Sequence, residues 1–142
     1  MEAIRHAGAG DVAAVLAFWN VATTAASPTD DAAALRALLA RHEDAVLLAI
    51  DDDQIVGTVI CTFDGWRGAM YRLAVDPAMR RRHVATSLVD AAERQLCASG
   101  ARRCHVIVMA DEEPARSFWS AAGYADHGDQ RRYVKNLTAV TG

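Results

Sequence analysis

The sequence predicts a mixed α/β fold in a single domain, with a mostly antiparallel sheet flanked by helices. Short β-branched or apolar runs alternate with longer runs of helical spacing, in the order β-α-α-β-β-β-α-β-α-β-β. The chain has 142 residues, of which 52% are hydrophobic, and this is enough to bury the core of one domain. It contains no internal repeat and no long linker, so we expect one domain over residues 1–142.

The N-terminal third of the chain predicts one strand and then two helices. The strand covers Glu2 to His6, and Gly10-Asp11 precedes the first helix. A second helix opens at Ser27-Pro28-Thr29-Asp30. Each helix has one apolar stripe, formed by Val12, Val15, Leu16 and Trp19 in the first and by Leu35, Leu38 and Leu39 in the second. We interpret both stripes as core.

The rest of the chain predicts a hairpin, a third strand, and strands that alternate with helices. Polar or glycine-rich turns bound the first three strands, which are predicted at Ala45–Ile50, Ile55–Phe63 and Ala69–Val75. A long helix follows from Val84 to Ser99-Gly100. The remaining predictions are a buried strand at Arg103–Met109, a helix at Glu113–Ala122, and a closing hairpin of Tyr124–Asp126 with Arg131–Leu137.

Bulk composition bounds the class of function. The net charge is −3, which argues against nucleic acid as a partner. The three cysteines share no metal-type spacing, and the aspartates at 51 to 53 are interpreted as a solvated turn, so we expect no metal. The N-terminus lacks a secretory pattern and no apolar run reaches 18 residues, so we expect a cytoplasmic protein with no membrane partner.

The densest positive patch is Arg80-Arg81-Arg82-His83, between a predicted strand end at Val75 and a helix that begins near Val84. The N-terminus of a helix presents unpaired N–H groups and a partial positive charge, so a phosphate is its natural ligand. Arginine side chains beside it can neutralise further phosphate charge. The spacing alone favours the phosphate and leaves a solvated helix end as the alternative.

Two motifs carry a resemblance to a known family. The stretch from Val75 to Ala85 resembles the acetyl-CoA signature V-x-P-x-x-R-x-x-G-[IV]-[GA] of GNAT N-acetyltransferases, and departs from it only at His83. The stretch from Glu112 to Tyr124 resembles the second signature, N-x-x-A-x-x-[FL]-Y-x-x-x-G-[FY]. The chain is also similar to the enzymes of this family that acetylate an alanine of a ribosomal protein. The resemblance implies a GNAT-like fold and acetyl-CoA as co-substrate.

The resemblance also implies a cofactor site. The strand before the first signature offers backbone groups to the pantetheine arm, and the loop and helix start bind pyrophosphate through backbone amides. These roles fall on Leu73, Ala74 and Val75 for the arm, and on Arg80, Arg81, Arg82, His83, Val84, Ala85 and Thr86 for the pyrophosphate. His83 replaces a glycine, whose freedom to adopt positive φ helps the backbone approach the phosphates. We expect this substitution to be tolerated.

The expected catalytic residues are Glu112 and Tyr124. Glu112 stands where the family often has Asn, and a carboxylate there can attract an ammonium group or take its proton. A helix-cap role is an equal alternative. Trp119 replaces the tyrosine that usually protonates the leaving thiolate, and indole cannot act as an acid, so water, Tyr124 or Tyr133 would supply the proton. Asp111, Glu113 and His105 are further candidates for the base.

The resemblance implies direct transfer of an acetyl group from acetyl-CoA to a primary amine. The acceptor, whether peptide, protein or small molecule, is left open, and the two N-terminal helices and the turn at Trp66 and Arg67 are expected to line its site. A non-catalytic acyl-CoA-binding module is the main alternative, because the usual Tyr and Asn are replaced. An RNA-binding domain is the third hypothesis. The fold is compatible with a homodimer.

Overall fold

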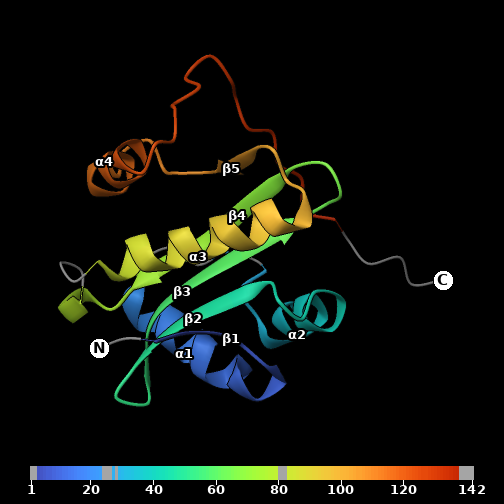
Figure 1. Cartoon of the computed structure of the whole chain (residues 1–142), viewed down its shortest axis with the longest axis vertical. Coiled ribbons are helices and arrows are strands. Elements are labelled where there is room, and N and C mark those ends of the chain that lie inside the picture. The colour runs from blue at the N-terminus through green and yellow to red at the C-terminus, as the bar shows by residue number, and fades with distance from the viewer. Residues whose placement is uncertain (1–2, 24–26, 28, 80–82, 138–142) are drawn as a thin grey trace. The chain divides into compact units, whose positions relative to one another are not determined.

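The structure is a computed structural model, which describes residues 3–23, 27, 29–79 and 83–137. It divides into two compact units, Met1–Ile107 and Val108–Gly142. The first unit contains the sheet and three of the helices (Figure 1). The second contains one helix and a long segment without regular structure.

The sheet confirms the predicted mixed α/β class. Its five strands lie in sequence order, and every neighbouring pair is antiparallel except β4 and β5. The strands are β1 (Ala3–His6), β2 (Val46–Asp51), β3 (Gln54–Phe63), β4 (Gly68–Val75) and β5 (Cys104–Val106). Asp52 and Asp53, which form the turn of the β2–β3 hairpin, both have positive φ, as a two-residue hairpin turn of type I′ requires.

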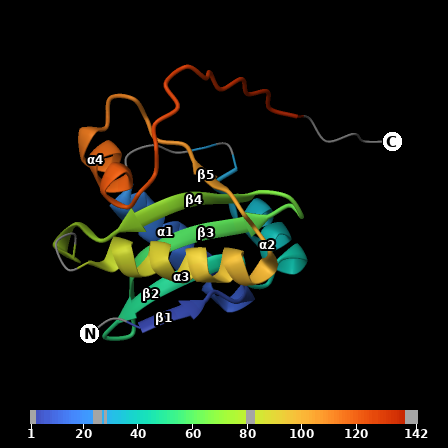
Figure 2. The ribbon, with the colours of Figure 1, turned by 45° about the horizontal axis from the view of Figure 1, so that its top comes forward.

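Helices cover both faces of this sheet. Figure 2 shows α3 (Val84–Ser99) on one face, with α1 (Val12–Ala22) and α2 (Ala32–Arg41) on the other. Helix α3 has the predicted bounds, and Gly100 ends it with φ 101°. Helix α2 begins later than predicted, because Asp31 is its cap and accepts a hydrogen bond from the Ala34 N–H at 2.8 Å.

Alternation along the strands divides the buried side chains between the two faces. The face toward α1 and α2 buries Val15, Trp19, Leu35, Val46, Leu48, Ile60 and Ala74 in one cluster. The predicted apolar face of α3 is buried at Val84, Leu88, Val89, Ala92 and Leu96. Thr58, in the centre of β3, is the one polar residue that is fully buried among the described residues. A buried hydroxyl needs hydrogen-bond partners inside the protein, so Thr58 must bond to groups around it.

The second unit departs from the sequence-based prediction. Its helix α4 (Glu113–Ala121) was predicted, but the closing hairpin is wrong, because residues 124–137 form no strand. Tyr133 and Leu137 are 91% and 86% exposed, and a hairpin with no buried apolar face is marginal in water.

In the first unit, strand β5 is shorter than predicted. It pairs with β4 over only three residues, and the side chains of Ile107 and Met109 beyond it are half exposed or more.

Candidate functional site

One edge of β4 lacks a neighbouring strand over its second half. The parallel ladder between β4 and β5 ends at Met70↔Val106, while β4 continues to Val75 and stays paired with β3 on its other side. The predicted arm-binding residues Leu73, Ala74 and Val75 lie in this half. Their backbone groups on the β5 side face no strand of the described chain. This edge is therefore suited to an extended ligand that hydrogen-bonds as a strand would.

The same half of β4 contains a bulge. Thr58 pairs with Ala74 and Ile60 pairs with Tyr71, so two residues of β4 stand opposite one residue of β3. Arg72, one of the two, has a φ of 53°, in the left-handed region that residues with a Cβ avoid. Backbone strain of this kind persists only where its surroundings hold it, and it is common at functional sites.

Helix α3 begins beside the end of β4. Its N-cap is His83, with φ 60° and ψ 22°, so the sequence argument that this position needs positive φ agrees with the backbone. The imidazole is exposed, and Ser87 N–H donates to the His83 carbonyl at 3.0 Å as the first turn closes. The N–H groups of a helix's first turn have no carbonyl one turn earlier. Those of Val84, Ala85 and Thr86 form the predicted anion-binding end of the helix.

Gly57 brings the strand end and the helix start together. It pairs with Val75 across the β3–β4 ladder. A Cβ built on Gly57 would lie 2.8 Å from the Val84 Cγ1 and 2.8 Å from the Leu88 Cδ1. Only a residue without a side chain lets the first turns of α3 pack this closely against the sheet. The two halves of the expected cofactor site therefore meet at one glycine.

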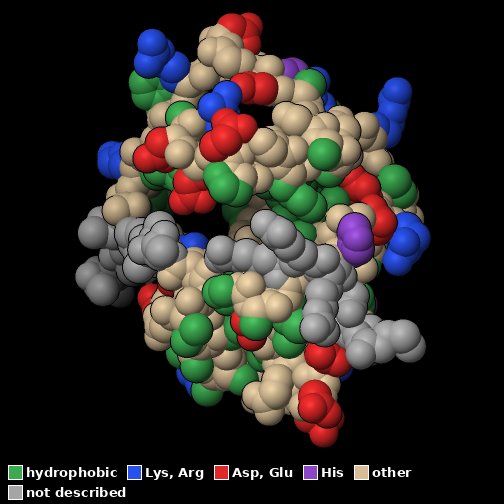
Figure 3. All heavy atoms as spheres, turned by 90° about the vertical axis from the view of Figure 1, so that its left-hand side faces the viewer, with side chains coloured by type: hydrophobic (Ala, Val, Ile, Leu, Met, Phe, Trp, Pro, Cys, Tyr) green, Lys and Arg blue, Asp and Glu red, His purple; other side chains and the backbone are tan. Residues whose placement is uncertain are grey.

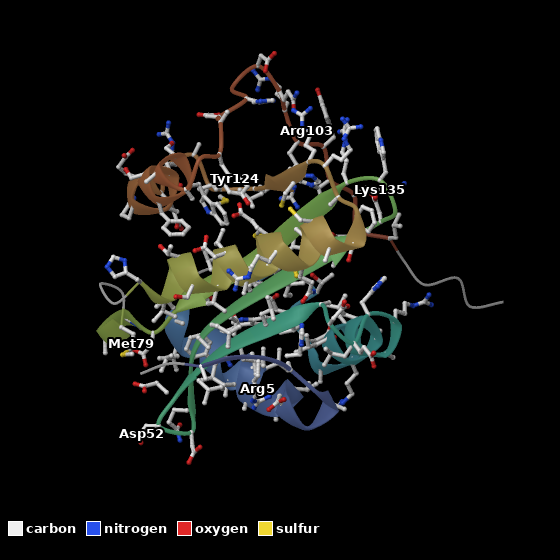
Figure 4. All side chains as sticks on the ribbon, in the orientation of Figure 1. Arg5, Asp52, Met79, Arg103, Tyr124 and Lys135 are labelled. Carbon is white, nitrogen blue, oxygen red and sulfur yellow. The ribbon has the colours of Figure 1, made fainter. Side chains whose placement is uncertain are left out.

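The loop between β4 and α3 is anchored at its start. Met79, labelled in Figure 4, donates its N–H to the Asp76 carbonyl at 2.8 Å, and the Asp76 carboxylate accepts from the Ala78 N–H at 2.9 Å. The predicted phosphate ligands Arg80, Arg81 and Arg82 lie outside the described residues. Figure 3 shows acidic and basic side chains of the described residues at the surface.

The α1–α2 side of β4 carries a polar group that the sequence analysis did not single out. The Trp19 indole N–H donates to the Thr58 hydroxyl at 2.9 Å, and that hydroxyl donates to the Arg72 carbonyl at 2.9 Å. The Arg72 Nε donates to Asp30 at 3.1 Å, and a second bond joins its Nη2 to the same carboxylate. The apolar stripe of α1 predicts a packing role for Trp19. Thr58, a polar residue inside the apolar run from Ile55 to Cys61, was the available signal.

The expected catalytic residues both lie in the second unit, at opposite ends of α4. Glu112 precedes the helix, is exposed, and its side chain caps no N–H. Tyr124, labelled in Figure 4, follows the helix and is half-buried. The nine-residue helix is about 13 Å long, so the two side chains cannot both reach the same atom of a substrate.

Trp119 has a packing role within the second unit. Its ring is buried and makes edge-to-face contacts with Phe118 and Tyr124, with centroid distances of 5.2 and 4.9 Å. The Tyr124 N–H also donates to the Trp119 carbonyl at 3.0 Å. The residue at the family's usual acid position therefore holds Tyr124 in place.

Other chemistry-bearing groups of the described chain do not extend this site. Burial raises the pKa of the Cys61 thiol to about 11, so that it is neutral and unreactive near neutral pH. Cys61, Gln95 and His42 line a pocket of about 210 Å³, which lies beside the C-terminal end of α3. Across the described residues we find no cluster of three metal-ligating side chains and no helix with the length and apolarity to span a membrane.

Comparison with known proteins agrees with the signatures. The chain is 29% identical to an acetyltransferase of Pectobacterium atrosepticum over 114 residues, which are 80% of this chain and 81% of that protein. The fold is similar to that of Ard1 from Thermoplasma volcanium, with a TM-score of 0.78 and 18% identity over 87% of this chain and 82% of that one.

A second solved structure is similar as well, the PaiA N-acetyltransferase of Thermoplasma acidophilum in complex with coenzyme A. Its TM-score is 0.77, with 15% identity over 86% of this chain and 88% of that chain. The sequence model of the acetyltransferase (GNAT) family matches residues 12–124, which include both signatures and most of the chain. The protein therefore belongs to the acetyltransferase (GNAT) family.

Proposed function

We propose that the protein is an acetyl-CoA-dependent N-acetyltransferase that moves the acetyl group to a primary amine by direct attack. The observation that carries the proposal is the meeting at Gly57 of the free β4 edge and the start of α3. A CoA thioester needs both an extended hydrogen-bonding edge for its arm and an anion site for its pyrophosphate. The family signature spans these two elements, from Val75 to Ala85.

We propose the cofactor residues that the family signature implies. Leu73, Ala74 and Val75 would bind the pantetheine arm through their backbone. The first-turn amides at Val84, Ala85 and Thr86 would bind the pyrophosphate, together with His83 and the arginines at 80 to 82. We further propose that the two units work as one domain over residues 1–142, because the family match runs across both of them.

The transfer itself needs no covalent enzyme intermediate. The neutral amine attacks the thioester carbonyl, a tetrahedral oxyanion forms, the C–S bond breaks, and the thiolate takes a proton while the amine loses one. Most of the rate would come from holding donor and acceptor together and from backbone N–H groups at the oxyanion. We assign Glu112 to the acceptor ammonium and Tyr124 to the thiolate, as separate roles that fit their positions at opposite ends of α4.

We propose that the acceptor is recognised near Asp30, which precedes α2. The ion pair of Asp30 with Arg72 joins this position to the bulge of β4, where the thioester would lie. Trp66 and Arg67 are also expected to line the acceptor site. In the turn before Gly68, the guanidinium carbon of Arg67 lies 4.0 Å from the centroid of the Trp66 ring. That turn lies at the far end of β4 from Val75, about 23 Å away at 3.3 Å per residue.

The burial of Trp119 favours one rival function, a module that binds acyl-CoA without turnover. An assay of free thiol release from acetyl-CoA, with a panel of peptide N-termini, lysine peptides and small amines, separates the two. Acceptor-dependent release of CoA with a stoichiometric acetylated product supports the enzyme. Tight binding of acetyl-CoA without release for any amine in the panel supports the module. Salt-dependent RNA binding without acetyl-CoA binding would contradict both.

A further inference from the structure

The strained bulge of β4 is held by a buried hydrogen-bond chain that starts in α1. Trp19 is 5% exposed and Thr58 is fully buried, so the bond from the indole N–H to the hydroxyl is shielded from water. The hydroxyl has one proton, and it donates this proton to the Arg72 carbonyl. The direction of the chain is therefore fixed, from Trp19 through Thr58 to the bulge.

This series of hydrogen bonds satisfies a backbone carbonyl at the point where the bulge disrupts the ladder. The backbone of β3 pairs with β4 at Ala74 and next at Tyr71, so the extra residue on β4 disrupts the regular pattern. The Arg72 carbonyl is instead satisfied by a side chain from β3. The Arg72 side chain is held as well, by Asp30 and by the Trp19 ring, whose centroid lies 5.7 Å from the guanidinium carbon. Backbone and side chain of the strained residue are both fixed from the α1–α2 face.

The fixed Arg72 carbonyl also sets the direction of the next backbone N–H, that of Leu73. In a trans peptide the C=O and the following N–H point in opposite directions. Because the Arg72 carbonyl points at Thr58, the N–H of Leu73 points away from the Thr58 hydroxyl. Leu73 is the first of the three residues proposed to bind the CoA arm, so its N–H lies on the side of β4 where that arm is proposed to lie.

We propose that Trp19 and Thr58 are positioning residues for acetyl transfer, which hold the β4 bulge so that the Leu73 N–H meets the thioester carbonyl. The inference rests on the proposed function, because it presumes that an acyl-CoA arm lies along β4. It adds two residues that belong to neither signature and to neither set of proposed cofactor-binding residues.

The test compares Thr58→Val with Thr58→Ser by calorimetry of both acetyl-CoA and CoA. Valine keeps the shape but can neither accept from Trp19 nor donate to Arg72, whereas serine keeps the hydroxyl. We expect Thr58→Val to bind acetyl-CoA about five-fold more weakly, the worth of one hydrogen bond, with CoA affinity changed less than two-fold. Once an acceptor amine has been identified, the kcat of Thr58→Val should be about 10- to 100-fold below that of the wild type. Thr58→Ser should stay within two-fold of wild type.

Thr62→Val is the matched control, because it makes the same replacement on the same strand, opposite Ala69 and away from the bulge. It should leave the affinities for both ligands unchanged. If Thr58→Val does not fold, Trp19→Phe carries the test, since Thr58 can still donate to Arg72. For Trp19→Phe we expect about a two-fold loss of affinity for acetyl-CoA and no loss of affinity for CoA.

Three results would overturn the inference while leaving the proposed function intact. They are an unchanged acetyl-CoA affinity in folded Thr58→Val (or in Trp19→Phe, if that variant carries the test), an equal loss for CoA and acetyl-CoA, and a defect in Thr58→Ser as large as that in Thr58→Val. Wild-type protein that binds neither ligand would instead overturn the proposed function. The two failures are therefore distinguishable.

Discussion

Gly57 and Val84 approach so closely that a Cβ on the glycine would lie 2.8 Å from the Val84 Cγ1. Valine is stiff at its single side-chain torsion, so it cannot swing away from such an atom without strain. The contact fixes the first turn of α3 against the strand that pairs with Val75. Both parts of the proposed cofactor site depend on this approach.

Gly57→Ala should therefore lower both stability and acetyl-CoA affinity. Replacement of glycine by alanine in a strand ordinarily gains up to about 1 kcal/mol from the unfolded chain. Here overpacking against Val84 and Leu88 costs about 1–3 kcal/mol, so we expect a net loss in the free energy of unfolding. Urea denaturation and calorimetry with acetyl-CoA measure the two effects.

Gly10→Ala is the control for this variant, because a Cβ there would meet no atom within 4 Å. It should be as stable as wild type or slightly more stable, with unchanged affinity. If Gly57→Ala behaved in the same way, the close approach of α3 to the sheet would not be what places the helix start.

His83→Gly should bind acetyl-CoA at least as tightly as wild type. Glycine adopts the observed φ of 60° without the cost of about 1 kcal/mol that a Cβ carries there. His83→Ala also lacks the imidazole but keeps the strain, so it separates the two effects. Calorimetry should rank the affinity of His83→Gly equal to or above that of the alanine variant. A marked loss in both variants would show instead that the imidazole contacts a phosphate.

Sequence patterns predicted α3 well because its signals are local. Five apolar residues recur at helical spacing from Val84 to Leu96, and Gly100 supplies the left-handed residue that ends the helix. The cofactor residues remain a proposal that rests on the resemblance to the family signature, which lies in one continuous stretch. The closing hairpin was wrong because alternation alone, with Tyr133 and Leu137 exposed, gives a strand no buried face.

The group around the β4 bulge could not be predicted in this way. Thr58 bonds to Trp19 and to Arg72, which lie 39 and 14 residues away in the sequence. No periodic pattern relates such positions, and the partners are known only once the strands are in register. A bulge also has no sequence signal here, because its left-handed residue is arginine and not glycine.

Asp11→Asn should remove a stabilising contribution that depends on pH. Hydrogen bonds from Arg5 and from the Gly8 N–H lower the pKa of the Asp11 carboxyl from 3.8 to about 2. A lowered folded-state pKa gives stability above the unfolded pKa, near 4, and this stability is lost as the pH falls from 4 to 2. Because half of the Arg5 side chain is exposed, we expect about 1 kcal/mol or less.

Thermal unfolding of wild type and Asp11→Asn at several pH values checks this prediction. The difference in Tm between the two proteins should be largest above pH 5, should shrink as the pH falls below 4, and should vanish only below pH 2. A constant difference over this range would mean that the carboxylate charge contributes nothing to the pair with Arg5.

The central claim is that β4 and the start of α3 form one acetyl-CoA site, and calorimetric titration of the wild type and of Ala85→Glu with acetyl-CoA tests it most directly. Ala85 lies in the first turn of α3, where a glutamate would bring negative charge and bulk to the pyrophosphate. A carboxylate in a helix's first turn does not itself destabilise the helix, so the variant should fold with an unchanged Tm. We predict saturable binding by the wild type and none by folded Ala85→Glu. Equal affinity of the two proteins would contradict the account.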